Sequence, residues 1–338
     1  MYQTQLMTLE TSFHRMNKDK KILVTGGTGY VGSHVSRAFK NEGYTVGVID
    51  CVYREYALDN IETYCIDDYA SDRALSYMIN FAPDVIVHCA GCAVVRPSMT
   101  NPSEYWNNNV AKNVKFLDVV RDLPTKPLII FSSSCSVYGL PKELPITEES
   151  EVNPISPYGN TKVTFEKMLH DYHVAYGVSS VSFRYFNAAG AEPFKFNLGQ
   201  EPGAPHIMAR VLESCITKTD FYLLGNNYNT EDGTGVRDYI HVWDLAMAHV
   251  KVVEQYNGPM LEVYNLGSGK GISNKEVIEY VQEKYGNFNV IVVEPNPGDP
   301  DKLYAHSNKF QSQYDWTMPL TNIDDIVNSA YKWYKKIL

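Results

Sequence analysis

A strand–turn–helix pattern near the start of the chain, at residues 21–43, restricts the fold more than any other feature. Residues 21–25 (KILVT) are a short apolar run typical of a buried parallel strand, and GGTGYVG follows at once. Glycines at 26, 29 and 32 allow a tight turn, close backbone approach to a pyrophosphate and close helix–strand packing. The N-terminus of the next helix offers N–H groups and a positive dipole end to an anion. The pattern predicts a dinucleotide-binding unit rather than an ordinary glycine-rich turn.

Strand-like and helical segments alternate beyond this turn. Apolar strand-like runs recur at residues 45–49, 64–67, 85–89, 128–131 and 180–186. Such alternation predicts a Rossmann-type α/β fold, a doubly wound parallel sheet with helices on both faces. Residues 187–205 are rich in Gly, Pro, Ala and Asn, which indicates a boundary. We expect a tail at 1–20, a dinucleotide-binding domain at 21–186, and a smaller α/β substrate-binding domain at 187–338, with a segment near 236–250 returning to the first domain.

Composition limits the classes of function. Hydrophobic residues make up 44% of the 338 residues, and the net charge of −9 comes without any long Lys or Arg run. This disfavours nucleic acid and anionic membranes as partners. No apolar run approaches the roughly 20 residues that span a bilayer, and no secretory signal opens the chain, so we expect a cytoplasmic protein. The six cysteines are expected to be free thiols. The C-x-x-C formed by Cys89 and Cys92 is weak evidence for zinc, and no metal is expected.

Several polar residues follow the strands that would face a dinucleotide. Asp50 lies 18 residues beyond Gly32, near the spacing of the acid that bonds an adenosine ribose. A carboxylate there repels a 2′-phosphate, which favours NAD over NADP, although Arg54 lies nearby. Asp67 is a candidate adenine contact or, equally, a helix N-cap. His88 lies within an apolar strand and is interpreted as a core residue.

The segment SPYGNTK, residues 156–162, carries the candidate chemistry. Ser156 suits a helix N-cap and Pro157 the first helical position, so Tyr158 and Lys162 lie four residues apart on one helix face. A nearby ammonium favours a phenolate, which makes Tyr158 a candidate general base toward a sugar or alcohol hydroxyl. An ordinary surface Tyr and Lys would share this spacing. The strand at 128–131 ends in serines 132–134, one of which should reach the substrate.

These three elements together resemble the extended short-chain dehydrogenase/reductase superfamily. Segments 26–34, 131–139, 184–187 and 230–242, with 244–246 and His249, are similar to the UDP-glucose 4-epimerase (UDP-galactose 4-epimerase) family. The similarity runs from about residue 21 to the C-terminus, and the block at 230–242 is its most specific part. The resemblance implies an isomerase that interconverts UDP-glucose and UDP-galactose through a 4-keto intermediate. Its NAD would be tightly bound and regenerated each turnover. It would be a homodimer that pairs helices near 105–120 and 158–176.

The resemblance also implies site residues. The catalytic residues would be Tyr158, Lys162 and Ser134. The NAD site would comprise Gly26, Gly29, Tyr30, Val31, Gly32, Asp50, Cys51, Asp67, Asp68, Cys89, Ala90, Gly91, Asn109, Ser134, Tyr158, Lys162 and Phe186. The UDP-sugar site would comprise Ser134, Tyr158, Asn187, Tyr222, Leu224, Arg237, Asn296, Asp299 and Leu303.

The chain departs from the family pattern at three places. Ala93 replaces a Lys near the cofactor, Asn296 replaces an Arg near the diphosphate, and Asp68 replaces an apolar residue. Leu303 is expected beside the sugar 2-substituent, and its intermediate size leaves UDP-GlcNAc/UDP-GalNAc epimerisation, or dual specificity, as an alternative. A 4,6-dehydratase or a decarboxylase would need an acid near Cys135. A non-catalytic NAD-binding protein would typically lack the Tyr or the Lys.

Overall fold

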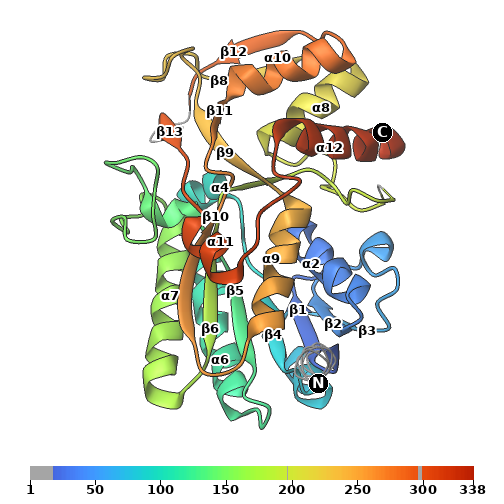
Figure 1. The fold of residues 1–338 in the computed structure, drawn as a ribbon, viewed down its shortest axis with the longest axis vertical. Helices are drawn as coiled ribbons and strands as arrows, with labels where there is room; N and C mark the ends of the chain where they lie inside the picture. Colours follow the sequence, from blue (N-terminus) through green and yellow to red (C-terminus); the bar gives the residue numbers. More distant parts are fainter. Residues whose placement is uncertain (1–17, 196, 296–298) are drawn as a thin grey trace, which may run out of the picture.

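A seven-stranded parallel sheet forms the larger layer of this computed structural model, which describes residues 18–195, 197–295 and 299–338 (Figure 1). The strand order is β10-β6-β5-β4-β1-β2-β3. The chain first adds β2 and β3 on one side of β1, and then adds β4, β5, β6 and β10 on the other side. A ligand crevice is expected where this reversal leaves the carboxyl ends of β1 and β4 side by side. The strands are β1 (Lys21–Thr25), β2 (Thr45–Asp50), β3 (Thr63–Ile66), β4 (Val85–His88), β5 (Leu128–Ser134), β6 (Ser180–Tyr185) and β10 (Leu261–Leu266).

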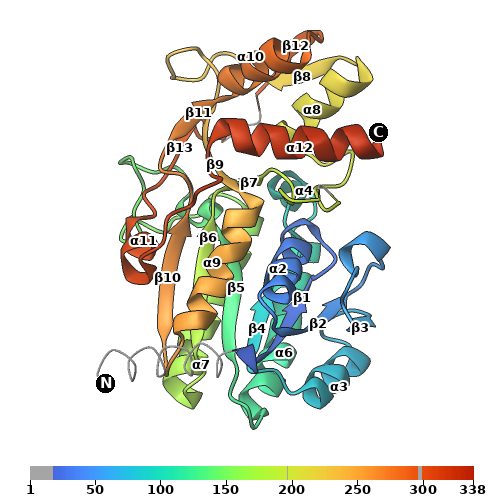
Figure 2. The ribbon, with the colours of Figure 1, turned by 45° about the vertical axis from the view of Figure 1, so that its right-hand side comes forward.

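Helices cover both faces of this sheet (Figure 2). Alternation along β1 sends Ile22 and Val24 into one apolar cluster and Leu23 into another. The first cluster holds residues of α2 (Tyr30–Asn41) and α9 (Val242–Gln255), and the second holds residues of α3 (Asp72–Phe81), α6 (Lys112–Asp122) and α7 (Pro157–Tyr176). The prediction of a doubly wound Rossmann-type sheet is therefore confirmed.

A smaller α/β unit lies beyond the carboxyl ends of the large sheet, at the top of both ribbon views. It has its own apolar core, which includes Leu212, Phe221, Val277 and Trp333. In the chain, α9 and β10 follow β9 yet pack on the large sheet, so the two units are interleaved in sequence. The elements of the smaller unit are β7 (Asn187–Ala189), α8 (Ile207–Thr217), β8 (Phe221–Leu224), β9 (Val236–His241), β11 (Gly271–Ser273), α10 (Asn274–Tyr285), β12 (Val290–Val293), β13 (Lys302–Leu303) and α12 (Ile323–Ile337).

The segment after β4 differs from the sequence-based prediction. A continuous helix was expected over residues 105–120, but the structure has α5 (Pro102–Trp106), a π turn η2 (Asn107–Ala111) and then α6. The wide turn carries Asn109, whose buried side chain hydrogen-bonds backbone outside the helix. The remaining elements are η1 (Glu55–Ala57), α4 (Val95–Thr100), η3 (Cys135–Tyr138) and α11 (Asn308–Tyr314). Among the described residues, no helix is both long and apolar enough to cross a membrane.

Candidate active site

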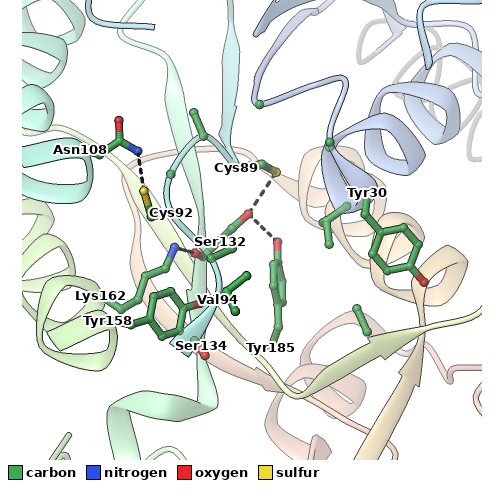
Figure 3. A pocket seen from close by; sticks show the side chains of 18 of the residues that line it. Tyr30, Cys89, Cys92, Val94, Asn108, Ser132, Ser134, Tyr158, Lys162 and Tyr185 are labelled. Carbon is green, nitrogen blue, oxygen red and sulfur yellow. Dashed lines mark hydrogen bonds between the residues drawn. The ribbon is translucent and has the colours of Figure 1, made fainter. Parts of the chain in front are cut away.

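A cavity of about 940 Å³ lies at the carboxyl ends of β1, β2, β4, β5 and β6, between the large sheet and the smaller unit (Figure 3). Most residues predicted from the sequence lie together on its wall. They are Gly26, Gly29, Tyr30, Val31, Gly32, Asp50, Cys51, Asp68, Cys89, Ala90, Gly91, Ser134, Tyr158, Lys162, Phe186, Asn187 and Leu224.

The glycine turn forms one end of the cavity. Gly26 has φ +68°, and its N–H donates to the carbonyl of Ile49 at 2.7 Å. A Cβ on Gly32 would lie 2.1 Å from the Gly26 oxygen, so only glycine lets α2 begin this close to β1. No side chain caps α2 at Gly29, which leaves its first N–H groups available to an anion. This cradle fits the pyrophosphate of a dinucleotide.

Asp50 is held at the rim of the cavity by backbone donors. Its two carboxylate oxygens accept hydrogen bonds from the N–H groups of Thr28 (2.9 Å) and Val52 (3.0 Å). The nearby Arg54 pairs with Glu201 at 2.9 Å. Because that guanidinium already has a carboxylate partner, the fixed carboxylate of Asp50 dominates this end of the cavity. The arrangement suits the ribose hydroxyls of NAD better than a 2′-phosphate.

Three predicted cofactor residues beside β3 and β4 differ in their positions. Asp68 lines the cavity and forms an ion pair with Lys112, which also lines it. Asp67 does not line the cavity, and its carboxylate accepts from the N–H of Asp68 at 2.7 Å. Asn109 lies behind the cavity wall. It accepts from the Cys92 N–H at 2.8 Å and donates to the Cys92 carbonyl at 3.0 Å and to Thr161 Oγ1 at 3.1 Å. Asn109 therefore fixes the loop after β4 rather than facing the cavity itself.

The helix that carries the candidate base forms as predicted. Ser156 caps α7 by accepting from the Gly159 N–H at 3.1 Å, and Pro157 is the first helical residue. Tyr158 and Lys162 are buried on one face of α7 and both line the cavity. The Lys162 Nζ lies 5.6 Å from the centre of the Tyr158 ring and donates to the carbonyl of Ser132 at 2.6 Å. Figure 3 shows Ser134 next to Tyr158 at the end of β5.

Burial decides the electrostatics of this pair. It raises the pKa of Tyr158 well above its ordinary value, and a hydrogen bond with Ser134 acts in the opposite direction. Burial also lowers the pKa of Lys162 to about 8, while Cys89 and Glu166 raise it. The expectation that Lys162 lowers the pKa of Tyr158 is not met by the chain alone. The reason is that desolvation outweighs the ammonium, which is directed at the Ser132 carbonyl.

Of the predicted UDP-sugar residues that the structure describes in the smaller unit, Asn187 and Leu224 line the cavity, whereas Tyr222, Arg237, Asp299 and Leu303 lie outside its wall. Arg237 forms an ion pair with Asp299, another predicted UDP-sugar residue, at 2.7 Å. Tyr222 is 53% exposed on β8. Leu303, on β13, is partly buried against a cluster that includes Tyr138 and Phe186. Asn296 lies outside the described residues.

Sequence reasoning missed several residues of the cavity wall. Lys112 is one helical turn beyond Asn109, and that spacing could have identified it. Ser132 and Tyr185 belong to segments already singled out, and alternation along β5 and β6 could have identified them. No local signal indicates Cys92, Asn108, Gln200 or His206, which reach the cavity only through the packing of distant segments. His88 is buried and bonds Thr25 Oγ1 at 2.8 Å, as expected of a core histidine.

Comparison with known proteins agrees with this geometry. Residues 22–267 match the NAD dependent epimerase/dehydratase family. The UDP-glucose 4-epimerase of Lactobacillus helveticus is 35% identical over 330 residues, covering 93% of this chain and 97% of that protein. The structure of UDP-glucose 4-epimerase from Brucella ovis in complex with NAD has a TM-score of 0.88 at 34% identity, covering 94% of this chain and 98% of that one. The enzyme from Bifidobacterium longum in complex with NAD+ and UDP has a TM-score of 0.86 at 35% identity with the same coverage. The chain therefore belongs to the NAD-dependent epimerase/dehydratase family and is a homologue of the UDP-glucose 4-epimerases.

Proposed function

We propose that this protein is a UDP-hexose 4-epimerase that interconverts UDP-glucose and UDP-galactose with tightly bound NAD. One observation carries the proposal. Tyr158, Lys162 and Ser134 meet at the end of β5 in the same cavity that begins at the glycine turn of α2. A base is thereby held next to a dinucleotide cradle, as oxidation at a sugar hydroxyl requires. The relatives named above support the choice of UDP-glucose and UDP-galactose.

In the proposed mechanism, the Tyr158 phenolate takes the proton of the sugar C4 hydroxyl. Ser134 hydrogen-bonds the C4 oxygen, and the Lys162 ammonium favours the phenolate. The chemistry that bound NAD supplies is reversible hydride acceptance at C4, so that a 4-keto sugar forms between the two proton transfers. Tyr158 returns the proton after the sugar has presented its other face. NAD is regenerated within each turnover and is not consumed.

The nucleotide must stay held while the sugar turns. Asn187 lines the cavity, and Arg237 lies on β9 next to Leu303 of β13. A planar guanidinium suits a bidentate phosphate contact, so Arg237 would exchange its Asp299 partner for the diphosphate. Binding energy at the nucleotide then positions the reacting carbon. Ala93 stands where the family pattern has a lysine, so one positive charge is missing beside the cofactor. We propose that Lys112, which also lines the cavity, partly replaces that charge.

In the decisive experiment, purified protein is incubated with UDP-galactose and no added NAD. Proton NMR of the anomeric region then follows the nucleotide sugar. Conversion to the gluco form is expected, because the cofactor is retained and regenerated. A matched sample treated to remove bound NAD should regain activity when NAD is added. Absence of conversion by the untreated protein, even with NAD supplied, would contradict the proposal.

The second candidate substrate pair is UDP-GlcNAc and UDP-GalNAc, and Leu303 is the observation that favours keeping it. Its side chain has intermediate size and packs against an apolar cluster that includes Phe186 of the cavity wall. If Leu303 limits the space for a 2-substituent, Leu303→Tyr should lower the rate on UDP-GalNAc by about tenfold more than on UDP-galactose. Parallel NMR assays of both substrates measure the ratio. An unchanged ratio would remove Leu303 from the specificity argument.

We further propose that the enzyme acts as a cytoplasmic homodimer that pairs α6 and α7 of each subunit. Val114 of α6 and Val174 and Tyr176 of α7 are 47%, 72% and 51% exposed, so these two helices carry apolar side chains that a partner subunit could cover. We also keep the division into a NAD-binding part, 21–186 with the returning segment, and a UDP-sugar part as a proposal. Light scattering on the protein as it elutes from a size-exclusion column measures the number of subunits.

A further inference from the structure

The strand motif at residues 184–187 contains a charged residue that the proposed chemistry does not use. Arg184 does not line the cavity and is 6% exposed. Its guanidinium binds Glu166 of α7 through two contacts, Nη2 to Oε2 at 2.7 Å and Nε to Oε1 at 3.1 Å. The two side chains are 7% and 11% exposed. No other ion pair in the described part of the chain has both partners this deeply buried.

This ion pair ties together the elements that build the catalytic centre. The Ser133 hydroxyl donates to Glu166 at 2.5 Å, which joins α7 to β5. On the other side, Arg184 Nη1 donates to the Tyr138 hydroxyl at 2.9 Å, and Tyr138 donates to Asn265 at 2.7 Å. The network therefore links α7 with β5, β6, η3 and β10.

Both ends of this network lie next to the reacting groups. Tyr158, Lys162 and Glu166 follow one another at four-residue spacing and so share one face of α7. Ser133 lies between Ser132, whose carbonyl accepts from Lys162, and Ser134, which lies next to Tyr158. The Ser133–Glu166 hydrogen bond thus joins α7 to the end of β5 beside the hydrogen bond from Lys162 to the Ser132 carbonyl.

A buried ion pair is weak evidence of a gain in stability, because desolvating two charges offsets their attraction. Its effect on geometry is more definite. We propose that Glu166 is a positioning residue for the epimerisation, holding Tyr158 and Lys162 against the end of β5 and keeping an anion beside the Lys162 ammonium. This inference rests on the proposed function.

The charge of Glu166 also bears on Lys162. Burial lowers the pKa of Lys162, and Glu166 is one of the anions that act against that shift. The other ionisable groups that act on Lys162 or lie beside it are Cys89, Cys92, His88 and Tyr158. Among the groups that raise the pKa of Lys162, Glu166 is the carboxylate, whereas the other two are thiols. Removing it should make the ammonium easier to deprotonate.

The kinetic test uses the NAD-loaded enzyme. Glu166→Gln should lower kcat by about tenfold to a hundredfold, because the helix shifts relative to the strand, and change KM for UDP-galactose by less than about threefold. Adding Glu166→Gln to Lys162→Met should cost little more than Lys162→Met alone, since both act through the same group. Glu151→Gln, which breaks the exposed pair with Lys142, is the matched control. Normal kcat in folded Glu166→Gln, or losses that multiply in the double variant, would overturn the proposal.

Ser133→Ala is a milder version of the same test. It can decide the question if Glu166→Gln does not fold. It removes one hydrogen bond and leaves the ion pair intact, so kcat should fall in the same direction by a smaller factor. An unchanged kcat in Ser133→Ala would count against the proposal.

A third readout needs no turnover. Protein labelled with ¹³C at lysine Cε can be titrated by NMR, with the Lys162 signal assigned by its loss in Lys162→Met. Lys162 should titrate at lower pH in Glu166→Gln than in the wild type, and an unchanged midpoint would overturn the proposal. If the wild type epimerised neither nucleotide sugar, the proposed function would fail. The titration would still test whether Glu166 acts on Lys162.

Discussion

At the scale of single residues, Tyr158 shows burial and charge acting in opposite directions. The phenol is 7% exposed, and burial raises its pKa far above the neutral range. Within the chain, the Ser134 hydrogen bond acts against this rise, while the Lys162 ammonium donates to the Ser132 carbonyl. Burial thus makes the phenol hold its proton more tightly than a free tyrosine does. If Tyr158 is the base, we expect it to need the changed surroundings of a ligand-bound site.

Replacing Tyr158 by Phe should cut turnover by about a hundredfold or more, because the general base is lost. Bound NAD should remain, since the glycine turn, Asp50 and Lys162 are untouched. NMR of UDP-galactose conversion gives the rate, and NAD released on denaturation gives the occupancy. Tyr176→Phe, on the exposed end of the same helix, should behave as the wild type. Near-normal turnover in Tyr158→Phe would remove the base assignment.

At the scale of elements, the turn between β1 and α2 sets how closely the cofactor can approach. Gly26 takes a left-handed conformation that L side chains rarely adopt, at φ +68°. Gly32 lies where α2 crosses the same turn, and its place has no room for a Cβ. The two glycines therefore have different roles, one conformational and one steric.

Gly32→Ala should abolish retention of NAD, because its Cβ would lie 2.1 Å from the Gly26 oxygen and push α2 away from β1. A loss of unfolding free energy of about 1–3 kcal/mol is expected from the same overpacking. NAD content and a urea unfolding curve measure the two effects. Gly258→Ala is the control, since nothing lies within 4 Å of its Cβ position. Full NAD content in Gly32→Ala would show that the turn tolerates the shift.

The sequence predicted elements best where the signal is local. Ser156, Pro157 and the periodic face of α7 needed no distant contact, and neither did the glycine turn. The π turn at Asn107–Ala111 could not be predicted, because its cause is the bonding of Asn109 to the Cys92 backbone across the chain. The ion pair of Arg237 with Asp299 is equally non-local. Sequence spacing can predict that a residue lies at a strand end. Which side chain or backbone group it binds there depends on tertiary packing.

At the scale of the whole molecule, buried histidines control the response to acid. Burial lowers the pKa of His34 and His249 to about 4, and that of His88 and His241 to about 3. In the unfolded chain a histidine takes up its proton near pH 6.5. Below that pH the unfolded state binds more protons than the native state, so stability falls as the pH falls. Asp238 and Asp244 act oppositely, because burial raises the pKa of each to about 6.

With four histidines against two carboxyls, the free energy of unfolding should fall by on the order of 4 kcal/mol between pH 6.5 and 5. Urea unfolding at the two pH values measures it. His249→Gln should reduce the difference, whereas His170→Gln, on the surface, should leave it unchanged. Stability that is constant or rises on acidification would contradict the prediction.

The place of β10 has a consequence for synthesis on the ribosome. This strand, Leu261–Leu266, pairs with β6 at the edge of the large sheet. In the sequence, however, it lies between elements of the smaller unit, with β7 to β9 before it and β11 to β13 after it. The nascent dinucleotide half cannot complete its sheet until residue 266 has left the exit tunnel. Until then β6 is an open edge, and the apolar face of α2 lacks α9. We therefore expect the two halves to finish folding together, and we expect a fragment that ends at residue 186 to leave the edge of β6 unpaired and prone to associate with other chains.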